Sequence, residues 1–136
     1  MSGGGREGVM ILIFGALLGF ISVAFGAYAE HGLSKIVTDE NFRFLMTAVR
    51  YNQVNAVVTV AIGLALLDGK KYSNLRILKF SGLLFVLGTV LFSFSIYLSV
   101  SLDFPALVKI TPLGGMTIMA AWILLLVTGV FGIKKL

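Results

Sequence analysis

Four long stretches without a charged residue constrain this 136-residue chain more than any other feature. They cover residues 9–29, 51–67, 80–102 and 110–133. The hydrocarbon core of a bilayer is about 30 Å thick, and a helix needs about 20 apolar residues to cross it. Because lipid cannot hydrogen-bond exposed backbone groups, only helices and closed barrels span membranes. The stretches lack the alternating pattern of barrel strands, so they predict four membrane-spanning helices.

The composition also indicates a lipid environment. Hydrophobic residues make up 58% of the chain and charged residues 12%, whereas soluble domains carry about 25% charged residues. The net charge is +5, but the basic residues are scattered in ones and twos between apolar runs, without the interleaved aromatics of a nucleic-acid surface. The absence of cysteine excludes disulfides, thiolate catalysis and cysteine-based metal sites. We predict an all-α polytopic membrane protein whose partner is the lipid bilayer and not nucleic acid.

The first apolar run shares features with a signal peptide, because Arg6 precedes it and Ala27-Tyr28-Ala29 offers a cleavage pattern. The run is longer than the 7 to 15 apolar residues typical of signal peptides, so we expect a retained first span. We therefore predict a single four-helix transmembrane domain over residues 1–136. Its expected spans lie near residues 9–29, 50–67, 80–102 and 112–133.

The distribution of basic residues predicts the orientation of the chain. Four spans would place the N-terminus, the middle connection and the C-terminus on one side, with Arg6, Lys70, Lys71, Arg76, Lys79, Lys134 and Lys135. The other side would carry fewer basic residues: Lys35, Arg43, Arg50 and Lys109. Because the cytoplasmic connections of membrane proteins are enriched in Lys and Arg, we expect both termini to lie in the cytoplasm. We expect the protein itself to lie in the bacterial inner, or plasma, membrane.

The connection between the first two spans shows a helical pattern of its own. Thr38 or Asp39 can cap a helix, and Asp39 and Glu40 are favourable in a first turn. Apolar residues then follow at helical spacing: Phe42, Leu45, Met46 and Val49. We predict a helix that begins near Asp39 outside the membrane, lies at the interface, and continues into the second span.

Small residues form a stripe along the first span. Gly15, Gly19, Ser22 and Gly26 follow one another at spacings of four, three and four residues, so they lie on one helix face. A glycine pair four residues apart lets two membrane helices approach closely. The partner could be another span of this chain or a second subunit, and the first option is favoured.

A proline and two glycines mark the expected start of the fourth span. Thr111 is suited to the N-cap position and Pro112 to the first helical position. Gly114 and Gly115 would weaken a helix on their own. They therefore predict a close approach by a neighbouring segment.

Polar residues of the second span form a stripe that enters the bundle from the outer side. Arg50 and Gln53 are three residues apart, and Asn52, Asn55 and Thr59 follow at spacings of three and four. Buried amides need partners, and the third span offers the hydroxyls of Ser93, Ser95, Tyr97 and Ser99. We interpret the stripe as a hydrogen-bond network worth about 0.6 kcal/mol per contact. The alternative is a polar path for transport.

Glu30, His31 and Arg50 gather where the first two spans end. A metal site would normally need three or four ligands, and catalysis would need a nucleophile or a second acid-base group. We therefore predict no catalytic residue, metal or cofactor, and no enzyme activity.

We expect Glu30 to pair with Arg50 or Arg43, and His31 to hydrogen-bond to a carbonyl or a hydroxyl group. The alternative role of these residues is pH-sensitive gating or contact with a ligand. The full candidate cluster is Glu30, His31, Arg50, Gln53, Asn55, Ser93, Tyr97 and Thr111.

Several of these segments resemble a known family over nearly the whole chain. Residues 25–33, FGAYAEHGL, resemble the family segment GAFGAHGL, and Ala48-Val49-Arg50-Tyr51 is followed by Gln53. Residues 92–98, FSFSIYL, resemble FSGSLYL, and residues 110–115, ITPLGG, with Trp122 resemble ITPxGG followed by GW. The chain is similar to small bacterial membrane proteins of the YgdD and YwdK type, which share domain of unknown function 423 and are related to the transmembrane protein 256 family.

The resemblance implies a four-span inner-membrane protein without an assigned activity. Two departures stand out, because the family usually has a histidine where Asn55 stands and a small residue where Glu30 stands. An asparagine hydrogen-bonds but carries no proton at neutral pH, so this chain would lack one member of any histidine pair. A specialised relative is implied, such as an accessory subunit.

Two hypotheses for function follow. The first is a non-catalytic structural or accessory protein that forms a homo-oligomer or joins a larger membrane complex. The second is a small transporter or ligand-binding protein with a polar site in the outer half of the bundle. Mutually satisfied polar groups without a cavity would favour the first, whereas a hydrated path or a bound ligand among them would favour the second.

Overall fold

A computed structural model describes residues 3–68 and 75–133 of the chain, and the described part is helical. The long helices are α1 (Gly3–His31), α2 (Asp39–Asp68), α3 (Leu75–Thr89) and α5 (Thr111–Ile133). Shorter elements connect or extend them: the 3-10 helix η1 (Leu33–Lys35), the π-helix η2 (Val90–Phe94), α4 (Ser95–Ser101) and the 3-10 helix η3 (Pro105–Ile110).

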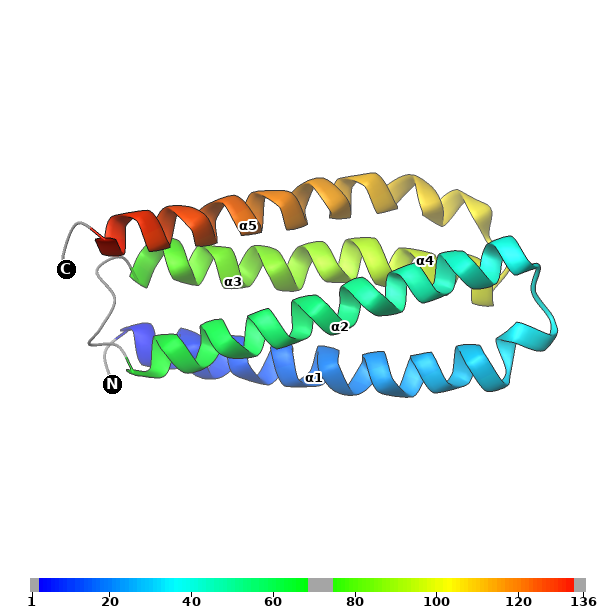
Figure 1. Cartoon of the computed structure of the whole chain (residues 1–136), viewed down its shortest axis with the longest axis horizontal. Helices are drawn as coiled ribbons and strands as arrows, with labels where there is room; N and C mark the ends of the chain where they lie inside the picture. Colours follow the sequence, from blue (N-terminus) through cyan, green and yellow to red (C-terminus); the bar gives the residue numbers. More distant parts are fainter. Residues whose placement is uncertain (1–2, 69–74, 134–136) are drawn as a thin grey trace.

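These elements form four antiparallel rods of a bundle (Figure 1). The third rod consists of α3, η2 and α4, and the fourth of η3 and α5. The start of α1 and the end of α5 lie at one end of the bundle, and η1 lies at the other (Figure 1). In the part of the chain that the structure describes, four helices are long and apolar enough to cross a membrane, which confirms the predicted fold class. The basic residues Lys70, Lys71, Lys134 and Lys135 of the orientation argument lie outside the described residues.

The helix expected near Asp39 begins at that residue and continues without interruption to Asp68. Thr38 is its cap, since the Asn41 backbone N–H donates to the Thr38 hydroxyl at 3.1 Å. The apolar side chains Leu45 and Val49 are buried. Capping and periodicity together therefore located this helix correctly.

The third rod differs from the uninterrupted α-helix that the sequence suggested. A π-helical turn at Val90–Phe94 separates α3 from α4. The backbone of this turn is also where α5 comes closest, because a Cβ atom added to Gly114 would lie 2.7 Å from the carbonyl carbon of Leu91 and would clash with the Phe92 nitrogen. π-Turns inside α-helices are rare and often occur at functional sites.

The start of the fourth rod corrects the prediction for Thr111. Thr111 is not an N-cap, because the 3-10 helix η3 already precedes it and its own backbone is helical. Its hydroxyl lies 2.6 Å from the Ser95 hydroxyl instead, which joins α5 to α4. Pro105, not Pro112, stands at the beginning of the rod. The predicted close approach at Gly114 is present, whereas Gly115 has only ordinary contact with the Phe92 ring.

Two apolar clusters and a polar layer between them make up the interior. The cluster nearer the chain termini contains Ile11, Ile62, Leu66, Leu78, Phe85, Ile118 and Ala121. The other contains Ala29, Leu33, Leu45, Ala48, Val49, Ile96 and Tyr97. Between these positions along the rods, the buried residues are largely polar: Ser22, Asn52, Asn55, Thr59, Thr89 and Ser93. We call these six residues the polar layer.

Candidate functional site: a groove between α1 and α2

The small-residue stripe of α1 faces α2 of the same chain. A Cβ atom added to Gly15 would lie 2.8 Å from the Val60 nitrogen, so no larger residue fits there without a shift. Added atoms at Gly19 and Gly26 would lie 3.7 Å from Ala56 and 3.4 Å from Val49. The first two helices therefore pack through glycine contacts near the middle of α1, with more room toward its C-terminal half.

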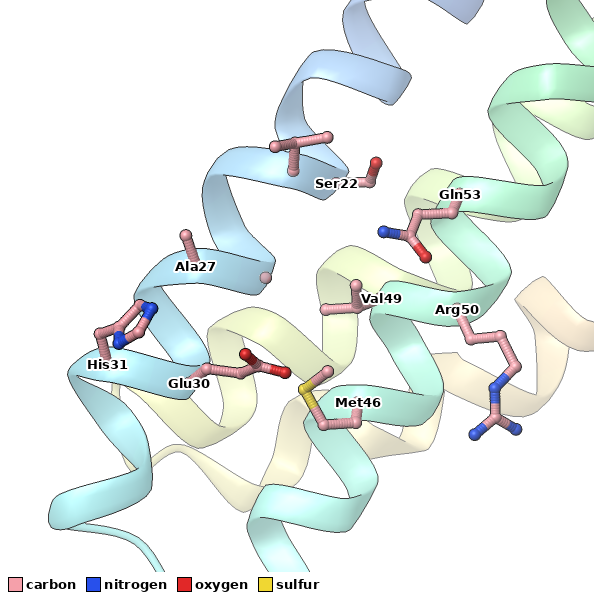
Figure 2. Close-up of a pocket in the computed structure, with 10 residues that line it drawn as sticks. Ser22, Ala27, Glu30, His31, Met46, Val49, Arg50 and Gln53 are labelled. Carbon is pink, nitrogen blue, oxygen red and sulfur yellow. The ribbon is translucent and has the colours of Figure 1, made fainter.

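An open groove of about 530 Å³ follows from this geometry. It lies between the C-terminal half of α1 and the N-terminal half of α2, and Figure 2 shows its walls. Its lining is Ser22, Val23, Gly26, Ala27, Glu30 and His31 from α1, with Met46, Val49, Arg50 and Gln53 from α2. The uncharged run of α1 ends at Ala29, so the groove begins at the expected membrane edge. It reaches about 12 Å inward, the length of eight helical residues from Glu30 to Ser22.

The structure divides the predicted polar cluster into two sets. Glu30, His31, Arg50 and Gln53 line the groove. Asn55, Ser93, Tyr97 and Thr111 are buried inside the bundle. Ser22 belongs to both regions, because it lines the groove and is also a member of the polar layer.

The charged groups of the groove do not form the expected ion pair. Within residues 3–68 and 75–133, Glu30 forms no salt bridge with Arg43 or Arg50, and the His31 side chain makes no hydrogen bond. All of these side chains are exposed. In Figure 2 the Glu30 carboxylate is directed toward Met46 across the groove, whereas the Arg50 guanidinium points away from α1. The groove thus keeps an uncompensated carboxylate at its rim.

The deeper polar groups of the groove are amide and hydroxyl. Gln53 extends toward α1 in Figure 2. The Ser22 hydroxyl donates to the Gly19 carbonyl at 2.6 Å, which leaves its oxygen lone pairs as acceptors. Val23, Ala27 and Val49 provide apolar walls between the rim and Ser22.

The interior set makes one of the contacts that the sequence suggested. The Asn52 amide donates to the Tyr97 hydroxyl at 3.0 Å, which joins α2 to α4 as a side-chain hydrogen bond between spans. Ser93 does not donate to an amide oxygen, because its hydroxyl proton is used on the Ala48 carbonyl at 2.7 Å. Backbone carbonyls therefore compete with side chains for the hydroxyls of the third rod.

The side-chain amide of Asn55 has no hydrogen-bond partner within the described residues, and Asn55 is only 1% exposed. Both its amide nitrogen and its oxygen are unpartnered, and so is the amide oxygen of Asn52. Burying an unpaired amide costs about 1 to 3 kcal/mol. The polar layer therefore lowers the stability of the fold. The predicted hydrogen bonds between Asn55 and hydroxyls of the third rod are absent.

Sequence reasoning missed the apolar half of the groove. Val23 and Ala27 look like ordinary span residues, and Met46 like a residue of the helix before the second span. Nothing in their pattern distinguishes a groove from a lipid-facing surface. The spacing of Gly26 to Glu30, one helical turn, was the available signal. Among the described residues, no three His, Cys, Asp or Glu side chains lie close enough together to hold a metal ion.

The family to which the sequence motifs pointed also matches the chain as a whole-family pattern. Residues 25–115 match the family described as "Protein of unknown function (DUF423)". The chain belongs to this family. The match includes Glu30, His31, Arg50 and Gln53 of the groove.

Individual relatives cover most of the chain. It is 36% identical over 126 residues to the UPF0382 inner membrane protein YgdD of Escherichia coli K12, covering 92% of this chain and 92% of that protein. It is 31% identical over 121 residues to the UPF0382 membrane protein YwdK of Bacillus subtilis, covering 89% and 96%. A UPF0382 membrane protein of Haemophilus influenzae is 34% identical over 111 residues, covering 79% and 83%. No solved structure matches the chain.

The family membership and the four long apolar helices together identify a multi-pass membrane protein. The family description names no activity. The role of this DUF423 protein must therefore be sought in its own geometry.

Proposed function

We propose that this DUF423 protein is a non-catalytic membrane protein that binds a membrane amphiphile in the groove between α1 and α2. One observation carries the proposal. The groove has a charged rim where the apolar run of α1 ends, and from there apolar walls lead inward to the buried hydroxyl of Ser22. Ligand sites are typically concave and mostly apolar, with a few polar groups that fix the orientation of the ligand. A headgroup at the rim and a chain along the walls would fit this arrangement.

The electrostatics of the rim support binding. Glu30 and Arg50 both line the groove without pairing with each other. Charges at the edge of a low-dielectric slab interact more strongly with a ligand than they would in water. Among the two sequence hypotheses, this geometry favours ligand binding over a purely structural role.

Native mass spectrometry of the full chain released from lipid-containing detergent micelles tests the proposal. Ala27→Leu places a larger side chain in the groove, so the fraction of protein that retains a phospholipid is expected to fall several-fold. Ala24→Leu is the matched control, because Ala24 is exposed on the same helix and does not line the groove. Equal lipid retention by the Ala27→Leu variant and the wild type would contradict binding in this groove.

A second role, as an accessory subunit, is favoured by a different surface. An apolar groove of about 650 Å³ separates α2 from α5 and includes Gly129 and Gly132. A Cβ atom added to either glycine would meet nothing within 4 Å. Exposed small residues allow the backbone of another membrane helix to approach closely. We therefore propose a transmembrane helix of a second copy or of a larger complex as the partner here.

Gly129→Leu tests the accessory role. The variant is expected to fold normally, because the site is open, and to lose its partner in mild-detergent co-purification followed by mass spectrometry. Ala120→Leu on the exposed side of α5 is the control, since Ala120 does not line this groove. Recovery of only monomer from the wild type would exclude the accessory role.

The cellular location is inferred from the relatives. YgdD is named an inner membrane protein, and we infer the same inner, or plasma, membrane for this chain. The excess of basic residues on the side of the termini supports a cytoplasmic N-terminus and C-terminus.

A further inference from the structure

We propose that the groove between α1 and α2 selects phospholipids whose headgroup carries a primary ammonium group, with the Glu30 carboxylate as its acceptor. This inference rests on the proposed function and names its ligand class. It follows from the charge at the rim of the groove and from the apolar side chains of its walls.

The first argument is the charge of the groove. The Glu30 carboxylate is directed across the groove, and within the described residues it has no ion-pair partner (Figure 2). Arg50 is the cation on the opposite wall, but its guanidinium points away from α1 (Figure 2). The space beside Glu30 therefore favours a cation, and it disfavours an anionic headgroup.

The second argument is hydrogen-bond chemistry. An ionised carboxylate only accepts hydrogen bonds, so the Glu30 carboxylate at the rim needs a ligand that donates them. A primary ammonium group has three donors and no acceptor. It matches the Glu30 carboxylate, whereas the quaternary ammonium of a choline headgroup has no N–H to donate.

The third argument identifies the source of the amine as a lipid. Val23, Ala27, Met46 and Val49 line the groove beside the polar groups. A free amine would leave these walls unused, whereas an acyl chain would cover them.

The test compares lipids that differ only in the headgroup. The full chain in detergent micelles is mixed in turn with dioleoyl phosphatidylethanolamine, phosphatidylcholine and phosphatidylglycerol, and the lipid-bound fraction is measured by native mass spectrometry. We expect the ethanolamine lipid to be retained about three- to fivefold better than the other two, as for an exposed ion pair. Equal retention of the ethanolamine and choline lipids would overturn the inference.

Two Glu→Gln variants test whether Glu30 is the residue that selects the ethanolamine headgroup. Glu30→Gln is expected to lower retention of the ethanolamine lipid to that of the choline lipid. Glu40→Gln is the matched control, because Glu40 is an exposed carboxylate on α2 that does not line the groove. A preference that survives Glu30→Gln, or that is lost equally in Glu40→Gln, would overturn the assignment of Glu30. Both side chains are exposed, so neither variant removes a buried contact.

Further measurements separate this inference from the proposed function. If all three lipids bind equally and Ala27→Leu removes all of them, the groove binds lipid but the amine selectivity is wrong. If Ala27→Leu leaves all retention unchanged, both proposals fail. Soluble glycerophosphoethanolamine is expected to compete poorly with the lipid; competition at equal concentration would show a free amine as the ligand and overturn the lipid source.

Discussion

At the scale of single residues, the burial of Asn55 could be predicted from the sequence, but the hydrogen bonding of its side chain could not. The spacing of Asn52 and Asn55 indicated that amides would enter the bundle, and both are buried. The partner of Asn52 came from the expected group of hydroxyls, at Tyr97. The outcome for Asn55 could not be predicted, because backbone carbonyls at Ala48 and elsewhere compete for the same hydroxyls.

Replacing Asn55 tests the cost of its unpartnered amide. Asn55→Leu removes an unsatisfied polar group of nearly the same size, so the free energy of unfolding is expected to rise by about 1 to 3 kcal/mol. Thermal unfolding in detergent would show this as a higher Tm. A lower Tm would mean that the amide has a hydrogen-bond partner in the membrane.

Tyr97→Phe gives the opposite expectation in the same layer. It removes the hydroxyl that accepts from Asn52 and leaves that buried amide without a partner. The free energy of unfolding is expected to fall by about 0.6 to 1.7 kcal/mol, the range found for hydrogen bonds between membrane helices. No change in the same unfolding measurement would indicate that the bond contributes nothing.

At the scale of an element, the third rod shows which structural features can be predicted from the sequence. The apolar run predicted its existence, and Gly114 predicted a close approach by a neighbour. The π-turn at Val90–Phe94 was not predictable, because its residues are ordinary helix residues of a membrane span. The turn lies opposite Gly114, where α5 packs closely against its backbone.

Two adjacent glycines provide a matched test of this contact. Gly114→Ala would place a methyl group against the backbone of Leu91 and Phe92, so a loss of about 1 to 3 kcal/mol in the free energy of unfolding is expected from overpacking. Gly115→Ala, whose added carbon would lie 3.8 Å from the Phe92 ring, is expected to change stability little. Equal effects of the two substitutions would contradict close packing of α5 on η2.

The bundle as a whole was the most predictable level, because four uncharged runs of membrane-spanning length leave few alternatives. The glycines of α1 also indicated a close helix contact, and the structure places it on α2. The groove was not predictable, since it depends on how α1 and α2 separate toward the end of the bundle that carries η1 (Figure 1). The separation of the polar cluster into a groove set and an interior set has the same origin, because spacing gives a helix face but not the neighbour that covers it.

The orientation of the whole molecule can be measured with single introduced cysteines, because the chain has none of its own. Ile36→Cys lies on an exposed position between η1 and α2, and Gly5→Cys lies near the start of α1. If the termini are cytoplasmic, a membrane-impermeant maleimide should label Ile36→Cys in intact cells and Gly5→Cys only after the membrane is opened. The reverse pattern would place the termini outside.

The central claim is that the groove between α1 and α2 holds a membrane lipid. An experimental structure of the full chain in nanodiscs that contain phosphatidylethanolamine tests it most directly. The account predicts density that begins beside Glu30 and follows Ala27 inward toward Ser22, with Glu30 not paired to Arg50. A groove closed by its own side chains, with Glu30 and Arg50 in an ion pair and no lipid density, would contradict it.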